Sequence, residues 1–180
     1  MTLVIVERAF EAPQQYAELQ AREDEVQFCF TTHRVTRLQS FLSADRRLMQ
    51  CLYDAPDAEA VRTTQHAAEL PVERVWPATC VVERWQPVPA GYALVVAQRD
   101  LPPGQTLEAV AQSAARPSGC NNRLRIKHLA AYLSLDCRRM CCIYSTPDVE
   151  SVRMANREDG LPIDRAWAAQ RIVVADYASR

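Results

Sequence analysis

Apolar and polar residues follow two different spacings along the first half of the chain. Residues 3–10, 34–43, 47–54 and 73–83 are rich in branched apolar residues or alternate between apolar and polar, which is typical of strands. Residues 13–27 instead place a few apolar residues at helical spacing in a charged segment. A second helix is predicted from Pro56 to just before Leu70, because proline suits the first helical turn and acidic residues follow it. The order β-α-β-β-α-β predicts a ferredoxin-like α+β unit with both helices on one face of a four-stranded sheet.

The second half of the chain repeats this pattern at a constant offset of 91 residues. A single offset that holds from strand to strand indicates duplication of one structural unit. We therefore predict one copy in residues 1–85, a proline-rich linker in residues 86–91 and a second copy in residues 92–180. Matching pairs include Arg8 and Arg99, Cys29 and Cys120, Tyr53 and Tyr144, and the whole segments 42–53 and 133–144.

Alternation along the hairpin strands predicts which residues face the helices. The mostly apolar set expected there is Leu38, Ser40, Leu42 and Leu52, with Leu129, Ala131, Leu133 and Ile143 in the second copy. The opposite face is expected to carry Arg37, Gln39, Phe41, Met49, Cys51 and Tyr53, and in the second copy His128, Ala130, Tyr132, Met140, Cys142 and Tyr144.

This second, helix-free face is too apolar to be left in water. Packing the two copies sheet to sheet would bury both faces and form a pseudo-twofold α+β barrel with an interior pocket. The chain would then be a monomeric pseudo-dimer or part of a homodimer. The predicted ligand pocket consists of Arg37, Gln39, Phe41, Met49, Tyr53, His128, Tyr132, Met140 and Tyr144.

Composition and net charge limit the classes of molecule that the chain is expected to bind. The net charge of −1 gives no electrostatic footprint for nucleic acid, and no apolar run is long enough to span a membrane. The seven cysteines are odd in number and the N-terminus reads as a strand rather than an export signal, which predicts free thiols in the cytoplasm. A small molecule or a metal ion is the expected partner.

Cysteine and histidine supply the candidate chemistry. Cys51 and Cys142 are either small buried hydrophobic residues or a pair of soft metal ligands, to which His128 could add an imidazole. Cys141 should project opposite to Cys142, because neighbouring residues in a strand face opposite ways. Arg8 and its counterpart, near the ends of the first strands, are expected to be solvated or to form strand-end salt bridges.

Several of these residues also form a pattern that resembles a bacterial family of small nickel-binding, ferredoxin-like proteins. The resemblance rests on Val6-Glu7-Arg8, Cys51-Leu52-Tyr53, Pro56-Asp57-Ala58-Glu59-Ala60-Val61-Arg62 and Leu70-Pro71-Val72-Glu73-Arg74, and on their counterparts in the second copy. It implies paired ferredoxin-like units in an α+β barrel, formed by a homodimer in one-copy members, and nickel bound through histidine and cysteine.

The chain departs from that pattern at the histidines. Family members often have a histidine in the second strand and another in the second helix. This chain has Gln39 and Ala130 at the strand position, and Thr64 and Ala155 at the helix position. Of the family's ligands only the strand cysteine persists, as Cys51 and Cys142. His128, which lies at no equivalent position, is the third candidate metal ligand.

Three functions fit the sequence. The first is a small-ligand or transition-metal binding protein, with nickel or another soft metal, whose site lies between the repeats. The second is a cofactor-independent isomerase, cyclase or oxygenase of the α+β-barrel kind that acts on a small hydrophobic metabolite. The third is a structural or regulatory partner protein whose barrel is filled by its own side chains.

Overall fold

The computed structural model describes residues 1–115, 119–161 and 163–174. Residues 116–118, 162 and 175–180, which the predicted second copy includes, lie outside the described residues. The first copy contains β1 (Thr2–Ala9), α1 (Tyr16–Glu25), α2 (Gln27–Thr32), β2 (Thr36–Ser43), β3 (Leu48–Ala55), α3 (Ala58–Ala67) and β4 (Arg74–Glu83). The second contains β5 (Ala93–Asp100), α4 (Leu107–Ala115), α5 (Gly119–Arg123), β6 (Lys127–Ser134), β7 (Arg139–Thr146), α6 (Val149–Glu158) and β8 (Arg165–Val173).

Fine details of the backbone repeat at the offset seen in the sequence. Asp57 caps α3, because its carboxylate accepts a hydrogen bond from the backbone amide of Ala60. Asp148 caps α6 in the same way, with the amide of Ser151 as the donor. Positive φ angles recur at equivalent positions, including Glu69 and Gly160 just after these two helices. The duplication predicted from the sequence is confirmed.

The strands pair with antiparallel neighbours in the ferredoxin-like order. In the first copy β1 lies between β3 and β4, and β3 also pairs with β2. In the second copy β5 pairs with β7 and β8, and β7 also pairs with β6. The complete hydrogen-bonded order, β1-β3-β2-β8-β5-β7-β6-β4, is that of a closed barrel, as predicted.

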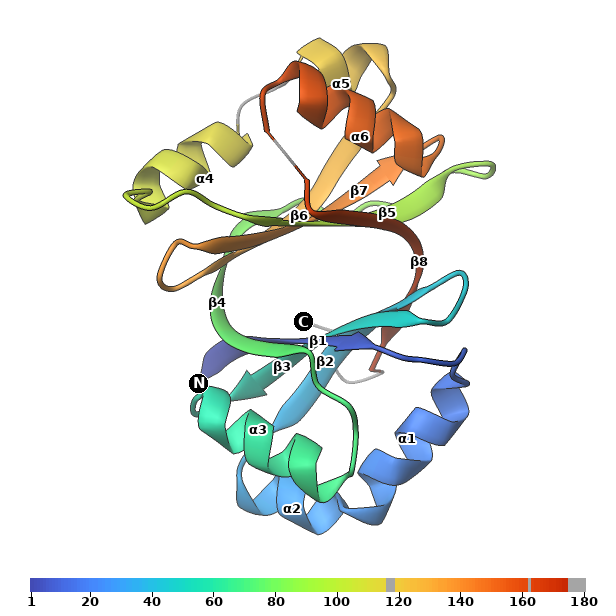
Figure 1. The fold of residues 1–180 in the computed structure, drawn as a ribbon, viewed down its shortest axis with the longest axis vertical. Coiled ribbons are helices and arrows are strands. Elements are labelled where there is room, and N and C mark those ends of the chain that lie inside the picture. Colours follow the sequence, from blue (N-terminus) through green and yellow to red (C-terminus); the bar gives the residue numbers. More distant parts are fainter. Residues whose placement is uncertain (116–118, 162, 175–180) are drawn as a thin grey trace. The chain divides into compact units, whose positions relative to one another are not determined.

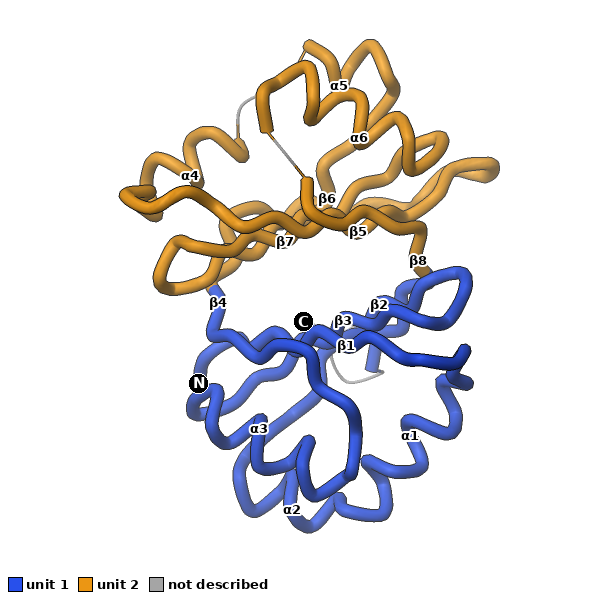
Figure 2. Tube along the Cα trace, in the orientation of Figure 1, with its two compact units in different colours: residues 1–78, 170–180 blue, residues 79–169 orange. Residues whose placement is uncertain are grey.

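The chain forms two compact units, and the boundaries between them fall inside β4 and β8. Unit 1 comprises residues 1–78 and 170–180, and unit 2 comprises residues 79–169 (Figure 2). The last residues of β8 therefore belong to unit 1, where the amide of Val174 donates to the carbonyl of Leu38. The second half of β4 belongs to unit 2, where the next residue, Arg84, donates its amide to the carbonyl of Leu129.

Within each unit, the helices cover one face of the sheet (Figure 1). In unit 1 the core under α1, α2 and α3 contains Val6, Leu19, Phe30, Met49 and Val61. In unit 2 the core under α4, α5 and α6 contains Val95, Val110, Leu133, Met140 and Val152. No helix among the described residues is long and apolar enough to cross a bilayer.

A second short helix follows the first one, which the sequence did not reveal. The helix expected over residues 13–27 corresponds to α1, which ends before Val26, and α2 starts after Val26 and extends beyond the expected range. Val26 has φ −112° and ψ 23°, outside the helical region. The break lets α2 turn Phe30 into the core, where its ring lies 6.4 Å from that of Tyr53.

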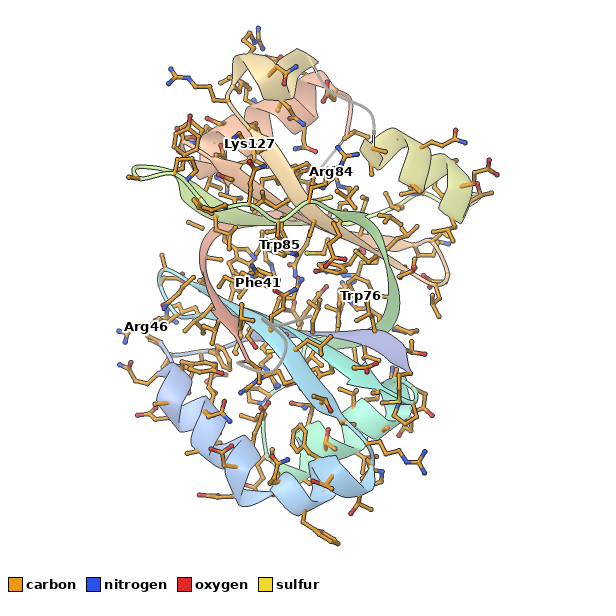
Figure 3. All side chains as sticks on the ribbon, turned by 180° about the vertical axis from the view of Figure 1, so that it is seen from behind. Phe41, Arg46, Trp76, Arg84, Trp85 and Lys127 are labelled. Carbon is orange, nitrogen blue, oxygen red and sulfur yellow. The ribbon has the colours of Figure 1, made fainter. Side chains whose placement is uncertain are left out.

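The predicted division of the hairpin residues between the two faces was right for Leu42, Ala131 and Leu133, but wrong for Met49 and Cys51. The turn at Arg46 (Figure 3) sets a register in which Leu42 pairs with Met49 and Ser40 with Cys51. These four residues therefore share one face, and it is the helix side. A one-residue error in register moves every side chain of a strand to the opposite face.

A bulge in β2 changes the faces a second time. Between Arg37 and Gln39 the register shifts, so Arg37 pairs with Tyr53 and turns toward the helices, while Gln39 pairs with Leu52. The same shift occurs between His128 and Ala130. Residues predicted to lie on the helix-free face but found on the helix side are Arg37, Met49, Cys51, Tyr53, His128, Met140, Cys142 and Tyr144.

Candidate functional site

A cavity of about 400 Å³ lies inside unit 2, with residues of the sheet and of α4 and α6 in its wall. This volume is at the lower end of the range found for small-molecule sites. Leu101, Val110, Ala114, Ile126 and Met140 supply apolar surface. Arg99, His128, Cys142, Tyr144 and Asn156 supply polar groups.

Arg99 is the buried charge of this cavity. It sits near the end of β5 and is only 4% exposed. Its Nη2 donates to Oδ1 of Asn156 at 2.6 Å, and Asn156 in turn donates to the carbonyl of Val152 at 2.9 Å. The Nε of Arg99 has no hydrogen-bond partner among the described residues. The expectation that Arg99 would be solvated or would form a strand-end salt bridge was wrong, because the strand end lies beneath a helix.

His128 and Tyr144 form the adjoining polar wall. Their rings stack with centroids 4.8 Å apart, which holds the imidazole in place. Within the described part of the chain, Nε2 of His128 is buried and has no hydrogen-bond partner. Burial, together with the nearby Cys142, raises the pKa of Tyr144 well above its usual value, so its hydroxyl remains a neutral donor.

Cys142 has an unusual environment for a buried thiol. Burial by itself would raise its pKa. A hydrogen bond with His128 and the positive charge of His128 and Arg99 act in the opposite direction and lower the pKa to about 7. The cavity therefore contains a thiol that ionises near neutral pH.

Basic residues line the exposed side of the same cavity. Arg84 and Lys127, both labelled in Figure 3, are exposed, and Lys127 donates to Oε1 of Gln86 at 3.1 Å. Asp159 adds a negative charge to the wall. With Arg99, the cavity has three permanently positive side chains and one carboxylate, so its potential favours an anion.

The equivalent place in unit 1 is occupied by the protein's own side chains. Glu23 of α1 is 5% exposed and corresponds to Ala114. Its carboxylate accepts a hydrogen bond from Arg37 at 2.6 Å and another from the hydroxyl of Tyr53 at 2.7 Å. Arg8 completes the cluster, with its Nη2 3.7 Å from the carboxylate.

The cations of this cluster have further partners. Arg8 donates to the side chain of Gln65 and, at 2.9 Å, to the carbonyl of Pro71. Arg37 also donates to Gln20, and its guanidinium lies 5.4 Å from the ring centre of Tyr16. The closed ion cluster of unit 1 and the cavity of unit 2 therefore occupy equivalent positions of the two copies.

The predicted pocket residues divide among several surroundings. His128, Met140 and Tyr144, together with the predicted metal ligand Cys142, line the cavity of unit 2. Arg37, Met49 and Tyr53, with the predicted metal ligand Cys51, lie in the helix-side cluster and core of unit 1. Gln39, Phe41 and Tyr132 are buried on the strands but belong to neither helix-side core. Cys51 and Cys142 therefore lie in separate units.

Sequence reasoning did not identify Arg99, Asn156 or Ala114 as parts of a site. A signal was present in the repeat itself. Arg8 and Arg99 are identical, whereas the acidic Glu23 is replaced by alanine. A retained cation whose carboxylate partner has been lost indicates a charge left open for another group.

A family model described as nickel responsive protein SCO4226-like matches residues 5–77 and again residues 96–168. The two matches cover most of the chain and correspond to its two copies. The chain belongs to this family.

Membership in the SCO4226-like family raises the question of a metal. Cys142 and His128 are adjacent, but no group of three or more histidine, cysteine, aspartate or glutamate residues suited to a metal ion occurs among the described residues. In unit 1 the counterpart of His128 is Arg37, a cation. Nickel sites need several nitrogen or sulfur ligands that converge, so these residues do not fit a nickel centre.

Solved structures that resemble this SCO4226-like chain include two of low sequence identity. A putative monooxygenase from Lactobacillus acidophilus NCFM has 8% identity and a TM-score of 0.49, with 97% of this chain and 100% of that chain covered. Chlorite dismutase from Candidatus Nitrospira defluvii has 11% identity and a TM-score of 0.48, with 98% and 94% covered. Neither similarity is close enough to carry an activity across. A search of curated proteins found no significant match.

Proposed function

We propose that this protein binds a small molecule in the cavity of unit 2. The observation that carries the proposal is the buried guanidinium of Arg99, which lines a cavity with both apolar and polar walls and leaves Nε without a partner among the described residues. A buried polar group without a hydrogen bond costs about 1–3 kcal/mol, and more when it is charged. A bound ligand that accepts from Arg99 removes this cost.

The remaining wall residues suit the same role. Val110, Ile126 and Met140 offer apolar surface for the body of a ligand, while His128 and Tyr144 offer directed polar groups. Apolar walls with a few well-placed polar groups are the usual composition of small-molecule sites. All the described residues that line the cavity belong to unit 2.

A substitution that fills the cavity tests this proposal. Ala109 lines it and is exposed, so Ala109→Trp should block ligand entry, whereas Ala115→Trp changes an exposed residue of the same helix outside the lining. Binding of a library of small acids, amides and alcohols would be followed by saturation-transfer NMR. We expect bound compounds to be lost in Ala109→Trp and retained in Ala115→Trp. Compounds that bind both variants equally would contradict the proposed site.

Cys142 favours a second function, that of a cofactor-independent enzyme acting on a small metabolite. The pKa of its thiol is lowered to about 7 by His128 and Arg99, although burial acts in the opposite direction. A thiolate formed beside an imidazole is a nucleophile or a base. In this case Cys142→Ser would abolish turnover of a bound compound while its affinity remained.

We also propose a cytoplasmic location, which suits the seven free cysteines.

A further inference from the structure

Equivalent positions of the two copies hold a buried ion cluster in unit 1 and a cavity in unit 2. The group that fills the position in unit 1 indicates the chemistry of a ligand for the cavity. In unit 1 a buried carboxylate, that of Glu23, lies among Arg8, Arg37 and Tyr53. The counterparts of these three donors in unit 2 are Arg99, His128 and Tyr144, and all three line the cavity. The counterpart of the carboxylate is Ala114, which also lines the cavity.

We propose that unit 2 binds a carboxylic acid with a hydrocarbon body, whose carboxylate occupies the place that Glu23 fills in unit 1. The inference rests on the proposed function of the cavity and adds the chemical class of the ligand. The carboxylate of the ligand accepts hydrogen bonds from Arg99 and Tyr144. In unit 1 the carboxylate of Glu23 likewise pairs with Arg8 and accepts a hydrogen bond from Tyr53. Nε2 of His128, buried and without a partner in the described part of unit 2, is available as a further donor.

The differences between the copies also open the space for such a molecule. Glu23, Phe30 and Leu19 are replaced by Ala114, Asn121 and Val110, all of which line the cavity. Every one of these replacements is smaller. The body of the ligand takes the space vacated by these side chains, against Val110 and Ile126.

The number of buried charges favours a monocarboxylate over a phosphate. Unit 1 uses two arginines around one carboxylate, whereas unit 2 retains only Arg99, because Arg37 is replaced by His128. A buried charge needs a matching partner. One buried arginine matches the single charge of a carboxylate. Arg84 and Lys127 are exposed, so water screens their charge and they compensate the second charge of a phosphate dianion less well.

The test uses three acids with their matched neutral amides: benzoate and benzamide, phenylacetate and phenylacetamide, hexanoate and hexanamide. Inorganic phosphate serves as a further probe. Binding to the full chain would be measured by calorimetry at constant ionic strength. We expect at least one acid to bind with a Kd below about 1 mM and at least tenfold more tightly than its own amide, a difference of about 1.4 kcal/mol.

The decisive variant is Ala114→Glu, which restores the carboxylate of unit 1 at the equivalent position of unit 2. It should weaken binding of the acid at least tenfold, because its own side chain takes the place of the ligand's carboxylate. Ala115→Glu adds the same charge to an exposed residue of α4 outside the lining and should leave the affinity unchanged. Arg99→Met provides an independent test should Ala114→Glu fail to fold, since it should weaken the acid but not the amide.

Each result decides between the two proposals or rejects both. Equal binding of acid and amide, lost in Ala109→Trp, would overturn the carboxylate inference and leave the cavity as a binding site. Phosphate binding as tight as the best acid would overturn the inference in the same way. Acid binding unaffected by Ala114→Glu and by Arg99→Met would exclude this cavity as its site. If none of the three acids binds with a Kd below about 1 mM, the inference is also refuted.

Discussion

Removing the carboxylate of Glu23 should convert the closed cluster of unit 1 into an open acid site. Glu23 is 5% exposed and accepts hydrogen bonds from Arg37 and Tyr53 at 2.6 and 2.7 Å. Breaking a buried ion pair by deleting one partner costs about 3–5 kcal/mol, because the other charge stays buried without compensation. We therefore expect Glu23→Ala to lower the free energy of unfolding by about 4 kcal/mol.

Small carboxylates should restore part of this loss. Acetate can enter the space left by the side chain and accept from the same donors. A ligand that binds only the folded state stabilises it by RT ln(1 + [L]/Kd), which is about 1.4 kcal/mol when acetate is present at ten times its Kd. Acetamide has almost the same shape but no charge, so it should restore much less.

Urea unfolding in acetate, acetamide and sodium chloride at matched ionic strength measures these effects. Glu25→Ala is the matched control, because Glu25 ends the same helix and is exposed, and its loss should change stability by less than about 0.5 kcal/mol. A loss below about 1 kcal/mol in Glu23→Ala would show that the cluster is not a tightly coupled buried site. Equal rescue by acetate and sodium chloride would show that general screening, not a carboxylate site, explains the recovery.

Other features give further predictions. The pKa of Cys142 is lowered from 9.0 to about 7, so His128→Ala should raise it, as measured by thiolate absorbance against a Cys142→Ser background. Because this acidic group has a depressed pKa in the folded state, its contribution to stability should be present above about pH 9 and lost as the pH falls through about 7; a wild-type advantage over His128→Ala that grows on acidification would contradict this sign. Gly160 has φ +68°, so Gly160→Ala should cost about 1 kcal/mol in urea unfolding, whereas Gly119→Ala in α5 should be neutral or stabilising; equal effects would refute the backbone argument. Calorimetric titration with nickel should show no binding tighter than about 1 mM, and tight binding lost in Cys142→Ser would overturn our reading of the ligand set.

Much of the fold can be predicted from the sequence because its strongest signals are local. The order of strands and helices follows from apolar spacing, and the constant offset between matched residues reveals the duplication. The ends of β1, β2, β3 and α3 differ from the expected ranges by at most about two residues, the usual uncertainty of element boundaries.

The faces of the hairpin could not be predicted in the same way. Whether Cys51 and Met49 point toward the helices depends on the turn at Arg46, which sets the register of β3 against β2. The orientation of Arg37 depends on the bulge that follows it. A bulge inserts one unpaired residue without a distinctive composition, so strict alternation gives the wrong face beyond it.

The candidate site was missed for a related reason. Its central residue, Arg99, was judged from its position near a strand end, where side chains are often solvated. Its burial depends on the helix packed above it. The replacement of Glu23 by Ala114 acquires meaning only when the hydrogen bonds of Glu23 are known.

The passage of β4 and β8 from one compact unit to the other affects any attempt to shorten the chain. A fragment ending at residue 85 would lose the end of β8, whose Arg171 donates from Nε to Oε1 of Gln39 at 2.7 Å. The edge of β2 would then present unpaired backbone groups, which tend to recruit another strand. Such a fragment should self-associate, so an ancestral gene with one copy of the repeat would have needed two molecules to complete what this chain now completes by itself.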